Sequence, residues 1–287
     1  DGRITKVAVL GAGVELGALD GRITVQIKSL LPTSQFVVGI WSSSKEETRQ
    51  MEIFSKSKTN LPELSEMIKG GPPKWRKTII TRGRLGLASG PYVVDTITIP
   101  EENPWGSWIR CSGFDFYKDG TSAAVSSVTG DIWIVSGIND DLTELKWYRF
   151  AAGLFQPLGL KIVNGKIHVL GRDQITRLHD LNQDGEADFY ESFNNDISIS
   201  NHYHEFCLNL STDPEGNFYF IKGGNLGAAT VPHQGCLIRV SKDGAKLEIV
   251  ATGHHAPNGM SVGPNGELTS ADNEGNWVPS SRVNLVQ

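Results

Sequence analysis

The sequence predicts an all-β protein in which most of the chain forms a β-propeller, preceded by a short β-rich segment with one or two helices. Three observations support this fold class. Short apolar runs alternate with glycine turns in units that recur from about residue 107. Glycine is abundant, with 32 residues against three methionines, which favours tight turns over long helices. Helical patterns are confined to residues 44–71.

Residues 1–70 are expected to be the C-terminal part of a preceding β-rich domain with a helical linker. Runs such as "ITKVAVLG" and "QFVVGIW" have the composition of strands, whereas residues 44–57 and 60–71 have helical patterns. The stiff stretch "GGPPKW" follows, and we place the propeller domain at residues 71–287. Because the chain begins without Met and ends in a strand-like run, we expect a piece of a longer protein, with the propeller incomplete at its C-terminus.

Four repeat units make up the predicted propeller. Residues 113–137, 157–180 and 204–253 each contain strands separated by glycine turns, and residues 256–275 begin the same plan again. Units of roughly 45 residues with this pattern are typical of propeller blades. A blade cannot cover its apolar faces alone, so neighbouring blades are expected to stack around an axis. A closed ring needs further strands, from the first hundred residues or from outside this chain.

Composition excludes several classes of function. The net charge of −5 gives no basic surface, so no nucleic-acid partner is expected. No apolar run approaches the roughly 18 residues of a membrane span, so no transmembrane segment is expected in this chain. Three cysteines allow at most one disulfide and fit no zinc pattern. The motif Cys-x-x-Cys-His does not occur, so no covalent haem is expected in this chain.

The stretch "DLNQDGEADFYE", residues 180–191, has the ligand spacing of a calcium loop. The flanking residues alternate like strands, which excludes an EF-hand and favours a calcium loop inserted between propeller strands. A hard cation prefers oxygen ligands, and glycine permits a turn tight enough for alternating side chains to converge. The alternative is a solvated acidic turn; a bound calcium would be structural rather than catalytic. The predicted ligands are Asp180, Asn182, Asp184, Glu186 through its carbonyl, Asp188 and Glu191.

Long collinear motifs point to a known family. "GFDFYKDG", "GDIWIVSGI", "RDQITRLHDLNQDGEADFYESFNND" and "HEFCLNLSTDPEGNFYFIKG" lie in order along the chain. Residues 68–287 resemble the propeller region of large secreted bacterial proteins labelled membrane-bound dehydrogenases, which are related to glucose/sorbosone dehydrogenases. The resemblance implies a six-bladed propeller in the periplasm or outside the cell. It also implies oxidation of a sugar or alcohol by pyrroloquinoline quinone, with electrons passing to a haem c domain or a cytochrome.

A site is expected where the innermost strands begin and the loops cross the axis. His204 is the best candidate for the base that removes a hydroxyl proton, because imidazole titrates near neutral pH, and related sugar dehydrogenases use a histidine at such a position. Arg172 and Lys222 could hold quinone carboxylates, and Trp277 could stack on a sugar. Arg172 and Asp173 could instead pair with each other, and His204 could be a tunnel-wall residue. The predicted catalytic residues are His204, Arg172 and Asp173. The predicted cofactor-binding residues are Lys222, Asn258, Asp272, Asn273 and Trp277.

Two other functions remain open at this point. The propeller could be a non-catalytic module that binds glycans or protein partners within a larger assembly. It could also be a lactonase-like hydrolase, which would need a tunnel calcium held by side chains such as Glu205, Asn258 and Asp272.

Overall fold

The computed structural model describes residues 4–11, 13–28, 36–43, 49–56, 64–224, 231–274 and 280–286. The chain divides into two compact units, residues 1–68 and 69–287. The larger unit therefore begins two residues before the predicted start of the propeller domain. Trp277, one of the predicted cofactor-binding residues, lies outside the described ranges.

The smaller unit combines short antiparallel strand pairs with short helices, as the sequence predicts. β1 (Ile4–Leu10) pairs with β4 (Val37–Ser43). β2 (Val14–Leu19) pairs with β3 (Arg22–Ile27) through a tight turn at Asp20 and Gly21. The helices are α1 (Arg49–Lys56) and α2 (Leu64–Met67).

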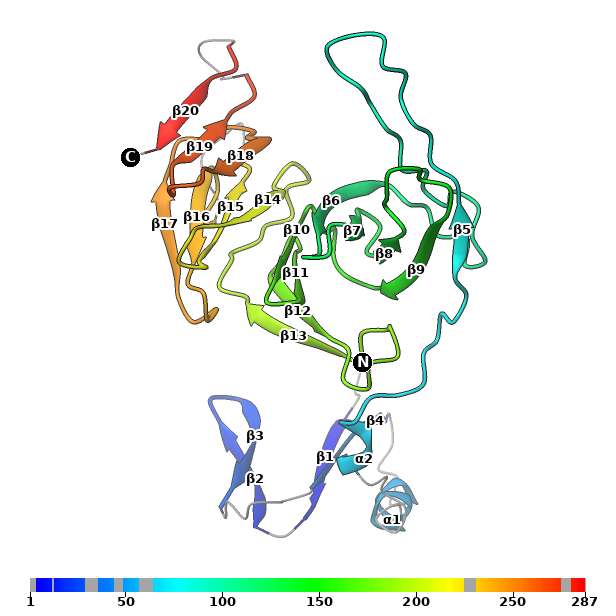
Figure 1. Ribbon diagram of the computed structural model, residues 1–287. Coiled ribbons are helices and arrows are strands. Elements are labelled where there is room, and N and C mark those ends of the chain that lie inside the picture. The colour runs from blue at the N-terminus through cyan, green and yellow to red at the C-terminus, as the bar shows by residue number, and fades with distance from the viewer. Residues whose placement is uncertain are drawn as a thin grey trace. The chain divides into compact units, whose positions relative to one another are not determined.

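The larger unit is a β-propeller segment of four antiparallel sheets within the described residues, which confirms the predicted fold class (Figure 1). The first blade contains β6 (Cys111–Phe116), β7 (Ser122–Ser127), β8 (Ile132–Ser136) and β9 (Leu145–Ala151), with β5 (Ile79–Thr81) paired outside β9. The second blade contains β10 (Gly159–Val163), β11 (Lys166–Leu170), β12 (Ile175–His179) and β13 (Phe189–Asn194). The third blade contains β14 (Cys207–Thr212), β15 (Phe218–Lys222), β16 (Cys236–Val240) and β17 (Leu247–Ala251). The fourth contains β18 (Gly259–Val262), β19 (Leu268–Ala271) and β20 (Val283–Val286).

The innermost strands contact one another in series, β6 with β10, β10 with β14, and β14 with β18. Glycine permits this close approach. A Cβ atom on Gly113 would lie 3.0 Å from the backbone nitrogen of Leu160, and one on Gly159 would lie 2.9 Å from Leu210. Larger side chains at these positions would force the inner strands apart.

The blades share their hydrophobic cores because strand residues alternate between the two faces of each sheet. In β8, Ile132 and Ile134 pack into a core with Leu160 and Val169 of the second blade. Trp133 and Val135 point to the opposite face and pack with Trp147. A similar core joins the second and third blades, where Phe193 meets Phe218 and Phe220. Stacking of neighbouring blades is therefore what buries the apolar side chains.

Candidate functional site

The antiparallel register places the predicted site residues at one end of the blades, where the inner strands begin. Leu170 at the end of β11 pairs with Gly159 at the start of β10, so Arg172 follows directly at that end. Lys222 pairs with Cys207, and Ala271, just before Asp272, pairs with Gly259. Residues far apart in the sequence thus reach the same axial face.

A cavity of about 610 Å³ lies at this face, between the loops of the third and fourth blades. Four predicted site residues line it: His204, Asn258, Asp272 and Asn273. Part of the cavity wall is apolar and consists of Phe206, Leu208 and Pro257. Its size falls in the range of ligand-binding pockets, and it combines polar groups with apolar surface.

His204 is an exposed residue of the β13–β14 connection. Its ring centroid lies 3.9 Å from that of Tyr203 and 5.8 Å from that of His202. The ring is therefore held against neighbouring aromatic rings at the rim of the cavity, where a neutral imidazole can accept a proton from a bound hydroxyl group.

Lys222 does not reach into the cavity, because its ammonium group is fully buried against Glu205, which is also fully buried. Lys222 also donates a hydrogen bond of 2.7 Å to the carbonyl oxygen of Ser198. Burial alone would raise the pKa of Glu205, but hydrogen bonds from Lys222, Ser200 and Gln234 bring that pKa below its usual value. The pair is thus a satisfied internal contact that ties the β13–β14 connection to the third blade.

Arg172 is likewise buried and bonded within the protein. It donates to Gln156 Oε1 at 3.2 Å and to the carbonyl oxygen of His202, and its guanidinium lies 5.6 Å from the Phe206 ring centroid. Among the ion pairs of the described residues there is none between Arg172 and Asp173. Arg172 therefore holds the turn that carries His202 and His204, while Asp173 stays half-buried beside it.

Asp272 shapes the cavity wall through its backbone contacts. Its carboxylate accepts hydrogen bonds from the backbone nitrogens of His255 at 2.8 Å and Ala256 at 2.9 Å, and it lies 3.4 Å from Arg282. By contrast, Asn258 and Asn273 are exposed, and the structure records only backbone hydrogen bonds for them. Their amide side chains are thus the polar groups best able to contact a ligand.

The described residues do not fit the predicted quinone at this cavity. Pyrroloquinoline quinone carries carboxylates that need cationic partners, yet none of the described lining residues is Lys or Arg. The two cations predicted to hold it, Arg172 and Lys222, are satisfied elsewhere. For the lactonase alternative, no three acidic, histidine or cysteine side chains among the described residues converge as a metal site.

The predicted calcium loop closes the β12–β13 hairpin, as expected for an insertion between strands. Gln183 and Gly185 take positive φ angles of 62° and 90°, which makes the turn tight. Asp180 accepts hydrogen bonds from the backbone nitrogens of Asp184 at 3.2 Å and Gly185 at 3.0 Å. Asn182 accepts one from Asp184 at 3.0 Å. These contacts keep the first three predicted ligands in one turn.

The carboxylates of the remaining acidic residues are engaged with other partners, although the predicted ligand of Glu186 is its carbonyl oxygen. Asp188 accepts from the backbone nitrogens of Gly71 and Leu181, each at 2.9 Å. The carboxylate of Glu186 accepts from the backbone nitrogen of Lys74 at 2.5 Å. Glu191 pairs with Arg177 at 2.6 Å and His179 at 2.6 Å on the neighbouring strand. In this arrangement the loop forms hydrogen bonds with residues 71–75. Calcium binding would require the carboxylates of the loop to turn inward.

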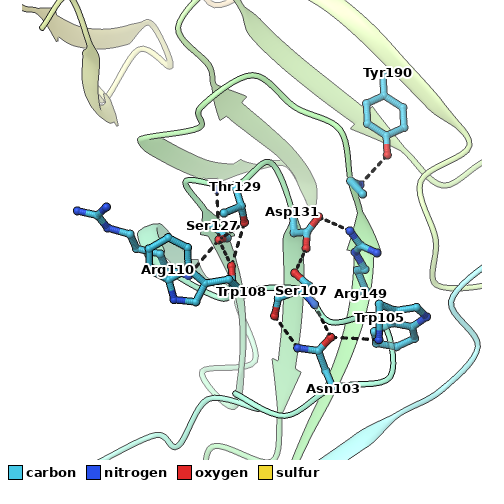
Figure 2. Close-up of polar contacts among 11 residues, drawn as sticks. Asn103, Trp105, Ser107, Trp108, Arg110, Ser127, Thr129, Asp131, Arg149 and Tyr190 are labelled. Atoms are coloured by element: carbon cyan, nitrogen blue, oxygen red, sulfur yellow. Dashed lines mark hydrogen bonds and ion pairs between the residues drawn. The ribbon is translucent and has the colours of Figure 1, made fainter. Parts of the chain in front are cut away.

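One buried acidic residue was missed from the sequence. Asp131, 3% exposed in the β7–β8 turn, accepts from Ser107 and pairs with Arg149 at 2.5 Å. Figure 2 shows these contacts beside Asn103, which bonds Ser107 in turn. Arg149 also lies 4.7 Å from the Trp75 ring centroid. An acidic residue between a turn glycine and an apolar strand was the available signal, but its partners are distant in the sequence.

The fold and the cavity define a β-propeller segment with a pocket of mixed polar and apolar lining at its axial face. No family model matches the sequence, and no curated protein matches it. Solved structures that resemble it include a glucose dehydrogenase-type oxidoreductase of Thermus thermophilus, with 19% identity, 62% of each chain covered and a TM-score of 0.49. They also include the holo pyranose dehydrogenase PQQ domain of Coprinopsis cinerea, with 11% identity, 71% of this chain and 49% of that chain covered, and a TM-score of 0.48.

A gluconolactonase of Xanthomonas campestris is a further similar structure, with 13% identity, 61% of this chain and 62% of that chain covered, and a TM-score of 0.40. The chain thus spans about three fifths of the length of the Thermus protein and about half of the pyranose dehydrogenase domain. These proteins are sugar dehydrogenase and gluconolactonase propellers, and at such identities the likeness concerns the fold. Within the described residues, no helix is long and apolar enough to cross a membrane.

Proposed function

We propose that this chain is the propeller part of a sugar or alcohol dehydrogenase-like protein, and that the axial cavity binds the sugar or alcohol. The observation that carries this proposal is that one cavity is lined by the exposed imidazole of His204 and by Asn258 and Asn273, whose side-chain amides have no hydrogen bond to the described residues. Amide groups donate and accept hydrogen bonds, which suits the hydroxyl groups of a sugar. Phe206 and Pro257 offer apolar surface for its carbon skeleton.

In this proposal each residue has a distinct task. Asn258 and Asn273 orient the hydroxyl groups, and His204 takes the proton of the hydroxyl group that is oxidised. Arg172 and the Lys222–Glu205 pair act as positioning residues, because they hold the connection that carries His204. The oxidation also needs an acceptor for the hydride, one proton with two electrons, that leaves the carbon. A haem c domain or cytochrome partner and export to the periplasm or cell exterior stay predictions from the family resemblance. Pyrroloquinoline quinone stays a prediction for which the described lining of this cavity offers no cationic partner.

The binding step is tested by saturation-transfer NMR with D-glucose, D-galactose and glycerol. We expect signals with the wild-type protein and weaker signals with Asn258→Ala. Asn265→Ala is the matched control, because Asn265 is an exposed amide in a hairpin turn away from the cavity. Equal signals from all three proteins, or none from the wild type, would contradict a sugar site at the axial cavity.

A non-catalytic propeller is the second candidate, and the engagement of Lys222 by Glu205 and of Arg172 by Gln156 favours it. Reconstitution with pyrroloquinoline quinone and calcium, followed by dye reduction with the same sugars, separates the two. Reduction that disappears in His204→Ala supports the dehydrogenase. Binding that depends on Asn258 without any reduction supports a module that only binds sugars.

A further inference from the structure

A second cavity, of about 600 Å³, lies between the first and second blades and shares no lining residue with the axial cavity. Its apolar floor is part of the core between these blades, including Ile134, Phe150 and Leu178. Its volume lies within the range of small-molecule sites. An apolar floor alone is typical of packing between blades. Whether the cavity can bind a ligand therefore depends on the groups around its rim.

Two tyrosines and several polar groups surround this floor. Tyr117 follows the inner strand β6 and Tyr148 lies in the outer strand β9. Both rings pack on the shared core and line the cavity. Among the described residues neither phenol hydroxyl has a hydrogen-bond partner. Burial raises the pKa of both phenols, so at neutral pH they remain protonated donors. Neither hydroxyl is among the buried atoms of the described residues that lack a partner, so both are open to solvent and can bond a ligand.

The remaining rim groups supply balanced charge. Lys166 and Asp180 line the cavity with opposite charges. The Lys166 ammonium lies 3.2 Å from His179 Nδ1, while His179 Nε2 lies 2.6 Å from Glu191. Each oxygen of the Asp180 carboxylate accepts one described hydrogen bond, which leaves further acceptor capacity. The rim therefore offers donors and acceptors without a net charge that would select an ion.

We propose that this cavity between the first and second blades binds a neutral saccharide of one or two rings. Aromatic rings pack on the C–H faces of a sugar, and the unpartnered phenol hydroxyls, Lys166 and Asp180 are suited to its hydroxyl groups. The site is distinct from the axial cavity of the proposed function and does not depend on it. Because Asp180 and Gly185 belong to the β12–β13 loop, a bound saccharide would also contact that loop.

The test uses the full chain and measures binding of D-glucose, D-galactose and cellobiose by saturation-transfer NMR titration. Tyr117→Phe and Tyr148→Phe keep the rings and remove only the hydroxyls, so the fold is retained, which circular dichroism checks. We expect each variant to weaken saccharide binding by about threefold to tenfold, the effect of one lost hydrogen bond. Tyr92→Phe is the matched control, because Tyr92 is 87% exposed and lies outside this cavity.

The variant Asn258→Ala distinguishes binding at the axial cavity, which Asn258 lines, from binding at the second cavity, which it does not line. Binding that weakens in Tyr117→Phe and Tyr148→Phe supports the second site, whether or not Asn258→Ala also weakens it through the axial cavity. Saccharide binding that is lost in Asn258→Ala and unchanged in both tyrosine variants places the sugar in the axial cavity alone and overturns the inference. Absence of saccharide binding, or binding unchanged in every variant, overturns it as well.

Discussion

At the scale of single residues, the propeller buries several charged or titratable side chains and satisfies most of them within the protein. Lys222 and Glu205 are both fully buried and bonded to each other, and Asp131 is bonded to Arg149. Removing one member of a buried ion pair leaves the other charge without a partner, which costs far more than breaking an exposed pair. Their first role is therefore to hold loops in place.

Lys222→Met should lower the free energy of unfolding by about 3–5 kcal/mol, because Glu205 would remain buried without its cation. Urea unfolding measures this change. Lys146→Met is the control, since Lys146 and Glu144 form an exposed pair and its loss should change stability little. Similar small losses in both variants would show that Glu205 is rehydrated or protonated without cost.

His168 should make stability depend on pH. It is 3% exposed between the rings of Phe193 and Phe218, and burial lowers its pKa to about 4. The unfolded histidine has a pKa of about 6.5, so below that pH the unfolded chain binds a proton that the folded chain does not. The contribution is complete above pH 6.5 and is lost as the pH falls towards 4, by at most about 1.4 kcal/mol per pH unit.

Urea unfolding between pH 7 and pH 4 tests this dependence. We expect a shallower decline in His168→Leu than in the wild type, because the variant lacks the buried imidazole. His204→Leu, at an exposed position, should decline as steeply as the wild type. Parallel curves for all three proteins would mean that other groups cause the dependence.

At the scale of elements, two turns with the same Lys-Asp-Gly sequence have different neighbours in the structure. Lys118-Asp119-Gly120 joins β6 to β7, and Lys242-Asp243-Gly244 joins β16 to β17. Both glycines have positive φ, +67° and +78°. A Cβ on Gly120 would meet nothing within 4 Å, whereas one on Gly244 would overlap the carbonyl oxygen of Phe193 in the second blade. The second turn is therefore also a contact between blades.

Gly244→Ala should destabilise the protein more than Gly120→Ala. The shared backbone strain costs about 1–2 kcal/mol in each variant, and overlap with Phe193 should add about 1–3 kcal/mol at Gly244 alone. Thermal and urea unfolding of the two variants give the difference. Equal losses would show that the blades separate easily at this contact.

The β12–β13 loop carries the calcium prediction, which calorimetric titration with Ca²⁺ tests. We expect one bound ion and a higher melting temperature with calcium, because a ligand that binds only the folded state stabilises it. Asp184→Ala should abolish both effects. Asp243→Ala is the control, because Asp243 has similar backbone contacts in a turn without further acidic ligands. No heat of binding and no thermal shift would favour the solvated acidic turn.

At the scale of the whole molecule, each blade depends on its neighbours. The core between the second and third blades and the core between the first and second blades share the second blade as a common wall. In repeat architectures, stability is approximately a sum of terms within repeats and terms between neighbours. A destabilising substitution in one shared core should therefore also lower the stability of the neighbouring blades.

Phe220→Ala, at a fully buried position, should cost about 3–5 kcal/mol. Hydrogen exchange followed by mass spectrometry should then show faster exchange in β8 of the first blade as well as in β15. Phe155→Ala is the control, because Phe155 is 49% exposed. Faster exchange confined to the third blade would show that the blades unfold independently.

The sequence by itself determined the local features of this protein. Alternating apolar residues and glycine turns specify the strands and blades, because these signals act between near neighbours in the chain. The outer strands β9 and β13 lay beyond the predicted units 113–137 and 157–180, since both interrupt their apolar runs with charged residues. The spacing of residues 180–188 indicated a tight polar hairpin loop for the same local reason.

Only the tertiary structure decided which side chains are available to a ligand. Lys222, Arg172 and Asp272 were predicted to bind or act on a ligand, yet partners from other strands and loops occupy them. Tyr117 and Tyr148, whose hydroxyls have no partner among the described residues, line a cavity that exists only because two blades stack. Availability depends on contacts between residues distant in the chain, and the sheet register and blade packing set those contacts.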